Sequence, residues 1–353
     1  MILLSMAPVD VARRTGNGRH PLWSFVMSVV CAMVLTAACS SPAEEGASQP
    51  SSSSSAGTRQ AQEVGQHGSD NPGSVNTFWL ETSEGLVIVD GQRTLSDARR
   101  ALAAIQDTGQ PVVAILITHA HPDHVGGLGV LHEAYPQTPI YASEATLTTM
   151  QADPLGFYAL TREQLSDDYP AELIYPDRIF EPDEPLEVGS VRLETAEFGP
   201  GETESASVYY EPNTGTLFSG DLINNQATPA LLEGHTCGWL NDLDRLRDSF
   251  PDARTIYPGH GSPGEPDRLM DQQRSYLESF RGLVRPAVSS SSPAGESVSP
   301  DEQESIIEEL ERLYPGYQSV ASLPTLLEEN VAAVARELLA EDTANLPSAC
   351  RAS

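Results

Sequence analysis

Three histidines and an aspartate fall within six residues of the stretch ITHAHPDHVGG, residues 117–127. They are His119, His121, Asp123 and His124. Imidazole nitrogens and carboxylate oxygens are side-chain groups that bind zinc in proteins. A lone histidine after an apolar strand is usually a packed or solvated residue, but this cluster fits a metal site and little else. Gly126 and Gly127 permit the close backbone approach that such a tight loop needs. The stretch therefore predicts a metal centre.

The elements before the cluster predict where it lies in the fold. Residues 76–90 read as a strand hairpin, and residues 97–106 have apolar side chains at helical spacing after a Ser96 cap. The apolar run 111–119 is then a strand that ends on the cluster. Strand, helix and strand in this order predict a parallel crossover, so the cluster lies at the carboxyl end of a strand.

The rest of the body alternates between strands and helices. A helix is expected at residues 128–134 and a strand at 139–143. Alternating apolar residues predict a second sheet from 186–198, 206–212, 215–223 and 255–261, with amphipathic helices at 242–250 and 268–280.

The stretch THAHPDHVGG resembles the HxHxDH signature of the metallo-β-lactamase superfamily. Two later stretches follow in the order of that family, FSGD at 218–221 and YPGHG at 257–261. The resemblance covers residues 75–280. It implies an α/β fold, the αββα sandwich of two sheets faced by helices, with a metal site at one sheet edge.

The resemblance also implies a set of ligands for two ions. His119 and His121 would hold the first metal, and Asp123, His124 and His260 the second, with Asp221 bridging them. In the family a histidine usually completes the first site, but this chain reads FGPGETESASVYY there, and Glu202 occupies the position.

The glutamate leaves three interpretations open: a ligand exchange, a lost ligand or a misalignment. A glutamate oxygen is a legitimate zinc ligand, and the alkylsulfatases are similar in using a glutamate here. Glu204 is the nearby competitor. His235 follows Asp221 in the chain, so its order is wrong for the missing ligand. His235 and Glu233 are read as pocket-wall residues or as parts of a structural loop.

The function implied is hydrolysis of a small molecule by a hydroxide that bridges two metal ions and is oriented by Asp123. Zinc is expected, with manganese or iron as alternatives. The scissile group would be an ester, lactone, thioester, amide or sulfate ester. Two other functions stay open: an iron-dependent persulfide dioxygenase of the same fold, and a non-catalytic binding module with a degenerate site.

Charge and the N-terminal sequence predict partners and location. The chain has 20 basic and 50 acidic residues and a formal net charge of −30, which argues against nucleic acid as a partner. Residues 1–39 read as an export signal that ends in LTAAC, and they resemble a bacterial lipoprotein signal with Cys39 as the lipidated residue. The expected location is the outer face of the bacterial cell membrane, held by that lipid. A cleaved secretory signal or a retained transmembrane helix are the alternatives.

Composition divides the remainder of the chain. Residues 40–73 are expected to be a disordered tether, 74–285 the metallo-β-lactamase-like domain, and 286–300 a second linker. Residues 301–345 are expected to form a helical appendage that packs on the domain or on a second copy in a homodimer. Cys237 and Cys350 could pair in an oxidising compartment, but the sequence leaves this open.

Overall fold

The computed structural model describes residues 63–68, 74–288, 298–321, 323–342 and 344–351. The predicted signal, the lipidation site at Cys39 and most of the predicted tether lie outside these residues. Within the described ranges, none of the helices combines the length and the apolar character that a membrane span requires.

The first sheet has six strands in the order β1-β2-β3-β4-β5-β6. Their bounds are β1 Val64–Gly68, β2 Asn76–Glu81, β3 Leu86–Val89, β4 Val112–Leu116, β5 Ile140–Ala142 and β6 Arg178–Ile179. β2 and β3 form the predicted hairpin, and β3 to β6 run parallel. The crossover helix is α1, Leu95–Asp107. Its N-cap is Thr94 rather than Ser96, because Thr94 has extended backbone angles and its side chain accepts the N–H of Asp97.

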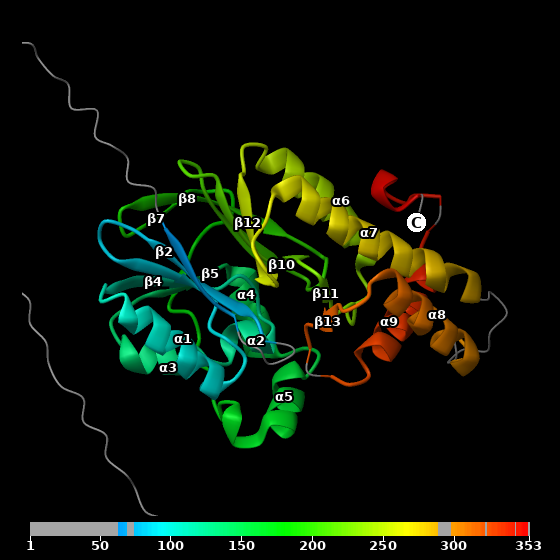
Figure 1. Ribbon diagram of the computed structural model, residues 1–353, viewed down its shortest axis with the longest axis horizontal. Helices are drawn as coiled ribbons and strands as arrows, with labels where there is room; N and C mark the ends of the chain where they lie inside the picture. The colour runs from blue at the N-terminus through cyan, green and yellow to red at the C-terminus, as the bar shows by residue number, and fades with distance from the viewer. Residues whose placement is uncertain (1–62, 69–73, 289–297, 322, 343, 352–353) are drawn as a thin grey trace, which may run out of the picture. The chain divides into compact units, whose positions relative to one another are not determined.

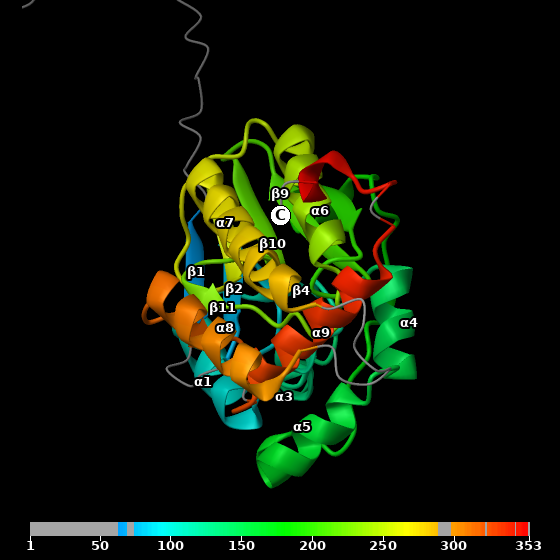
Figure 2. The same cartoon turned by 90° about the vertical axis from the view of Figure 1, so that its right-hand side faces the viewer.

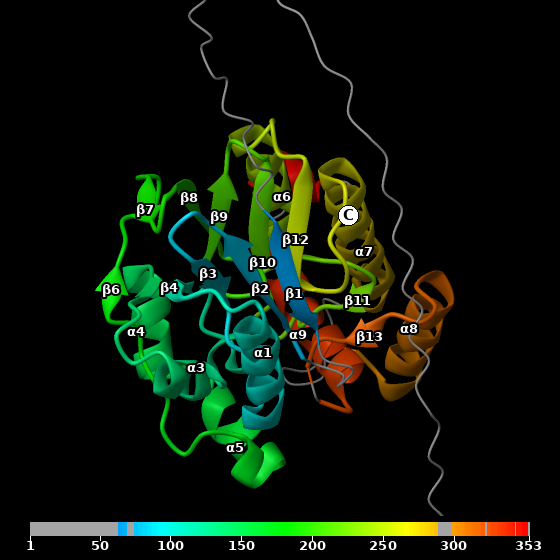
Figure 3. The same cartoon turned by 60° about the vertical axis from the view of Figure 1, so that its left-hand side comes forward.

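Strand β1 lies inside the segment that composition assigns to the tether. It pairs antiparallel with β2, from Val64 opposite Leu80 to Gly68 opposite Asn76 (Figure 3). The polar composition of the segment predicts no core, but an edge strand needs backbone hydrogen bonds more than apolar side chains. β1 thus covers the edge that β2 would otherwise expose.

The second sheet has the order β12-β10-β9-β8-β7. Its strands are β7 Leu186–Val188, β8 Val191–Phe198, β9 Ala206–Glu211, β10 Thr216–Asn224 and β12 Thr255–His260. Helices α1 and α3 (Leu128–Ala134) cover the outer face of the first sheet, and α6 (Thr236–Ser249) and α7 (Pro266–Val284) cover that of the second (Figure 1). Between the sheets lies an apolar layer that includes Phe78, Leu116 and Phe218. The predicted αββα sandwich is confirmed.

Four short elements complete the fold around the site. They are α2 Pro122–Val125, α4 Glu144–Ala152, α5 Phe157–Leu165 and β11 Ala227–Thr228. Three single turns of 3-10 helix are η1 Ser166–Asp168, η2 Arg285–Ala287 and η3 Ser348–Cys350.

The predicted helical appendage packs on the domain of its own chain. It consists of α8 (Pro300–Leu313) and α9 (Leu326–Ala340), which lie beside α7 (Figure 2), and of β13 (Gln318–Ser319), which pairs with β11. The buried Arg281 of α7 forms ion pairs with Glu337 at 3.2 Å and with Glu341 at 2.5 Å. The predicted homodimer stays a prediction.

The two cysteines in the body of the chain, whose pairing the sequence left open, form a disulfide. Cys237 in the first turn of α6 is bonded to Cys350, 113 residues later in the chain. The bond joins the C-terminal turn η3 to the helix that covers the second sheet.

Candidate metal centre

Most of the candidate ligands follow or end strands that meet at one edge of the sandwich. His119 and His121 follow β4, and Asp123 and His124 belong to α2. His260 ends β12, which runs parallel to β10. The loop after β4, as predicted, delivers its side chains at the carboxyl end of a parallel strand.

A bulge in β10 aims Asp221 at this edge. The register with β12 shifts on both sides of Gly220, whose φ is +50°. An added Cβ at Gly220 would lie 2.7 Å from the Thr118 hydroxyl, so this position requires glycine.

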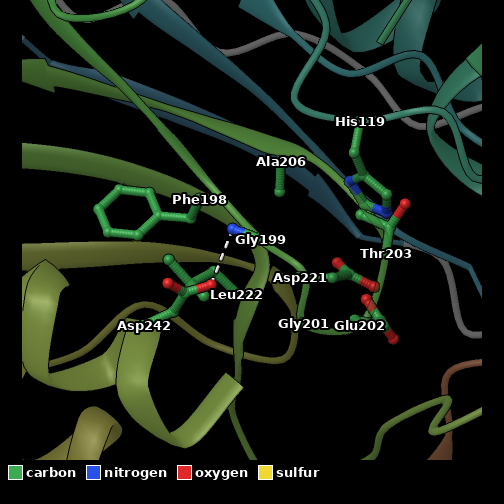
Figure 4. Close-up of a pocket in the computed structure, with 10 residues that line it drawn as sticks. All are labelled: His119, Phe198, Gly199, Gly201, Glu202, Thr203, Ala206, Asp221, Leu222 and Asp242. Carbon is green, nitrogen blue, oxygen red and sulfur yellow. Dashed lines mark hydrogen bonds between the residues drawn. The ribbon is translucent and has the colours of Figure 1, made fainter. Parts of the chain in front are cut away.

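Glu202 lies in the turn between β8 and β9. Asp242 on α6 fixes the start of this turn by a hydrogen bond, and a second hydrogen bond forms within the turn. The Gly199 N–H donates to Asp242 Oδ2 over 2.7 Å (Figure 4), and the Gly201 N–H donates to the Thr203 carbonyl over 2.9 Å. Figure 4 shows the side chain of Glu202 beside those of Asp221 and His119, away from the Asp242 end of the turn.

The structure brings the seven predicted ligands into two buried groups. Within each group the ligand atoms lie within 4.8 Å of one another. The Asp221 group comprises Asp123, His124, Asp221 and His260, and the Glu202 group comprises His119, His121 and Glu202.

Asp221 lies beside the Glu202 group as well as within its own, since its side chain is next to that of Glu202 (Figure 4). Its Oδ1 lies 3.2 Å from His124 Nε2, and its Oδ2 lies 3.2 Å from His260 Nε2. Asp123 Oδ2 is also 3.2 Å from His260 Nε2. In the other group His121 Nδ1 lies 4.0 Å from Glu202 Oε2.

Asp90 is a site residue that the sequence reasoning missed. Its Oδ2 accepts from His124 Nδ1 over 2.8 Å, and the carboxylate also accepts from the backbone N–H and the hydroxyl of Thr118. This contact leaves His124 Nε2 to face Asp221 and fixes the orientation of the ring. The sequence could have indicated Asp90, because it directly follows β3, and β3 lies next to the strand that leads to the histidines.

Arg93 is a second residue that was missed. Its guanidinium is buried, lies 3.2 Å from Asp123 Oδ2, and donates to the Val320 carbonyl over 3.0 Å. A buried cation beside a carboxylate ligand favours the ionised carboxylate.

Burial and charge shift the pKa values of the histidines in opposite directions. Burial lowers the pKa of His119 well below its usual value, and the neighbouring His124 and His121 act in the same direction. Burial also disfavours the charged form of His260, but the carboxylates of Asp221 and Asp123 outweigh it and raise its pKa to about 9.

The pKa values of the carboxylates are also shifted in opposite directions. Burial raises the pKa of Glu202 well above its usual value, and the charge of Asp221 adds to the effect. Burial opposes ionisation of Asp123, yet Arg93 and the neighbouring histidines hold its pKa well below the usual range. A carboxylate buried beside two others is costly to ionise unless a cation lies among them.

The hydrogen bonding of the ligand atoms in these two groups also fits a metal site. Among the described residues, five buried ligand-type atoms of the two groups have no hydrogen-bond partner. They are Nε2 of His119, His124 and His260, Oδ1 of Asp221 and Oε2 of Glu202. Buried polar atoms are normally paired, so their convergence points to a cation. Mixed imidazole and carboxylate donors suit zinc and also manganese or iron.

Glu233 and His235 lie next to the Glu202 group rather than in it. His235 Nε2 is 3.0 Å from Glu204 Oε1 on the more exposed side of the loop. Glu233 Oε1 is 3.3 Å from His121 Nε2. The structure thus separates Glu202, which is buried among candidate ligands, from Glu204, which is exposed and faces His235.

A pocket of about 550 Å³, including the part open to solvent, lies against both ligand groups. Most of its other walls are apolar, with Phe157 and Leu160 from α5 and Leu232, Val320 and Leu323 from the loop after β11 and the appendage, and the polar side chains of Arg93, Thr161 and Gln164 complete them. Helix α5 therefore borders the site.

Gly259, next to His260, gives a testable requirement. An added Cβ there would lie 1.7 Å from Asp221 Oδ1. Gly259→Ala should therefore displace Asp221 and lower kcat/KM by about 100-fold, since a misplacement of about 1 Å can cost that much. Gly282→Ala on α7, where nothing lies within 4 Å of the added carbon, is the matched control. Equal kcat/KM in both variants would contradict the placement of Asp221.

The fold and the two groups are those of a metallo-β-lactamase-type protein, and comparison with known proteins agrees. Residues 70–260, more than half of the chain, match the family described as the Metallo-beta-lactamase superfamily. The chain belongs to this superfamily, as the sequence motifs indicated.

Similar proteins include a hydroxyacylglutathione hydrolase from a Synechococcus strain, 31% identical over 47% of this chain and 57% of that protein. The probable metallo-hydrolase YqgX of Bacillus subtilis is 26% identical over 59% of this chain and 95% of its own length. A beta-lactamase domain protein from Burkholderia ambifaria has a similar fold, with a TM-score of 0.56 and 20% identity over 79% of this chain and 85% of that one. The match therefore spans little more than half of the Synechococcus relative.

Proposed function

We propose that the protein is a metal-dependent hydrolase that holds two ions, with zinc the first candidate. The observation that carries this proposal is the convergence of the Asp221 and Glu202 groups beside a pocket, with unpartnered ligand atoms in both. His119, His121 and Glu202 would hold one ion, and Asp123, His124 and His260 the other. Asp221 would be shared between them.

Bound zinc ions supply Lewis acidity and lower the pKa of water to near 7. The residues of the chain then have separate roles. Asp90 orients His124, and Arg93 keeps Asp123 ionised, so that its carboxylate can accept a hydrogen bond from the attacking water and orient it. The apolar walls limit the access of other water molecules.

The pocket supports a neutral or weakly charged small molecule as substrate. Its apolar walls favour an apolar group beside the scissile bond. Five classes of scissile bond suit the proposed chemistry: ester, lactone, thioester, amide and sulfate ester. The Synechococcus relative is named a hydroxyacylglutathione hydrolase, and an acyl group on the sulfur of glutathione is a thioester, so thioesters are a natural first assay.

Metal analysis together with an activity panel tests the proposal. Purified protein should contain about two equivalents of metal and should hydrolyse at least one member of a panel of p-nitrophenyl esters, lactones, thioesters, amides and sulfate esters. One iron per chain with oxygen uptake on a persulfide would instead establish the dioxygenase. Absence of metal after purification in zinc-supplemented buffer, with no hydrolysis, would favour a binding module.

We propose also that the protein is exported and anchored by a lipid on Cys39. The support is the LTAAC stretch after an apolar run, and a disulfide in the body of the chain suits an oxidising compartment. Cys39→Ala should move the protein from the membrane fraction to the soluble fraction in the producing bacterium. Retention of the variant in the membrane fraction would favour an uncleaved transmembrane helix.

A further inference from the structure

The two ring nitrogens of His121 face different partners. Nδ1 lies 4.0 Å from Glu202 Oε2 in the Glu202 group, and Nε2 lies 3.3 Å from Glu233 Oε1. The side chains of His121 and Glu233 are only 12% and 10% exposed. A carboxylate that accepts the Nε2–H of an imidazole leaves Nδ1 unprotonated and fixes the ring plane. Glu233 is therefore placed to present Nδ1 of His121 to a metal ion.

The segment that carries Glu233 also contacts Glu202. Residues 229–235 connect β11 to α6, and within them the Ala230 N–H donates to Glu202 Oε1 over 3.2 Å. That bond leaves Oε2 as the free oxygen that faces His121. One connecting segment thus supports two of the three members of the Glu202 group.

The same segment is held by α9 of the appendage. The buried Asn330 accepts from the Leu231 N–H over 2.7 Å and donates to the Pro229 carbonyl over 2.9 Å. Glu337, two turns later, accepts from the N–H groups of Thr236 and Cys237 over 3.0 and 2.8 Å. The first turn of α6 has no side-chain cap from its own N-cap residue, so Glu337 supplies the acceptor for it.

We propose that Glu233 is a positioning residue for His121, and that α9 holds Glu233 in place through Asn330 and Glu337. The helical appendage is then part of the support of the Glu202 group rather than only an added surface. This inference rests on the proposed metal-dependent function. It adds to that function a set of contacts through which α9 sets the metal affinity of the Glu202 group and not that of the Asp221 group.

The Glu233 contact is tested by zinc affinity, measured by competition with a chromophoric chelator. Glu233→Ala should weaken the Glu202-group ion by about 10- to 100-fold and leave the other ion within about threefold, the usual cost of losing an outer partner of a ligand. Glu233→Gln keeps an acceptor oxygen and should restore most of the affinity. Glu204→Ala, on the neighbouring exposed carboxylate, is the matched control and should bind as the unchanged protein does.

The tautomer of His121 provides a readout that a general loss of structure would not mimic. In nitrogen-15 NMR of the full chain in its metal-free form, where no ion fixes the tautomer, neutral His121 should carry its proton on Nε2, and Glu233→Ala should shift the population toward the other tautomer. An unchanged tautomer and zinc affinities within twofold of the original in Glu233→Ala would overturn the positioning role. Equal losses in the Gln and Ala variants would overturn it as well.

The role of α9 is tested with Asn330→Ala and Glu337→Gln, the second because a buried Asn330 variant can fail to fold. Both should weaken the Glu202-group ion selectively, whereas Glu329→Ala on the exposed face of α9 should not. Equal weakening of both ions, or of neither, would overturn the link. Failure of the unchanged protein to bind zinc would overturn the proposed function and this inference together, whereas normal zinc binding by every variant would overturn this inference alone.

Discussion

Glu202→Ala should lower the bound metal by about one equivalent and reduce kcat/KM by roughly a thousandfold, the effect of losing several kcal/mol of charge stabilisation. The reason is that Glu202 is the only carboxylate in its group, beside His119 and His121. Its Oε2 is buried without a hydrogen-bond partner, as expected of an oxygen that is left to bind a cation. Metal content by plasma emission spectroscopy and steady-state kinetics on the best panel substrate are the measurements.

Two comparison variants sharpen this result. Glu204→Ala should keep both the metal content and the activity, because its carboxylate is exposed and faces His235. Glu202→Gln preserves the size of the side chain and the acceptor for the Ala230 N–H but removes the charge, so it should lose metal almost as Ala does. A full metal complement in Glu202→Ala would contradict the ligand assignment.

Asp221→Ala should have a larger effect, with metal content below one equivalent and kcat/KM lowered by roughly ten-thousandfold or more. Each of its oxygens lies 3.2 Å from a histidine, His124 on one side and His260 on the other. Its charge also acts on Glu202, so both groups lose a neighbour when the side chain is removed. The loss should therefore not be confined to one ion.

Asp244→Ala is the matched control for this substitution, since Asp244 is a half-exposed carboxylate on α6 paired with Arg274. It should keep its metal and its activity. An Asp221→Ala protein that loses one ion and retains the other at full affinity would show that Asp221 serves a single ion, contrary to the shared role.

The short motif stretches were sufficient to predict six of the seven ligand candidates from local sequence. Four ligand candidates follow one strand within six residues, FSGD supplies Asp221 at the bulge within β10, and YPGHG supplies His260 at the end of β12. Such short-range patterns are readable because strand alternation and turn residues fix the direction of neighbouring side chains. The resemblance to a family then gave the sandwich, which the structure and the comparisons confirm.

Composition gave a wrong prediction for the edge strand β1 of the first sheet. Residues 64–68 have little to bury, so the sequence predicts a tether, yet they form β1 by pairing with β2. Backbone pairing depends on a free edge elsewhere in the chain and leaves no clear mark in the side chains of the added strand.

The sequence by itself determined which residue types could bind metal and the strand-helix-strand crossover that places four of them after one strand. Only the tertiary structure distinguished Glu202 from Glu204, two residues apart in one turn, because the turn buries the first among candidate ligands and exposes the second. Only the tertiary structure also joined Asp90 to His124, Glu233 to His121 and Cys237 to Cys350. These pairs are separated by 34, 112 and 113 residues, and the contact between such partners depends on how whole elements pack rather than on any local pattern.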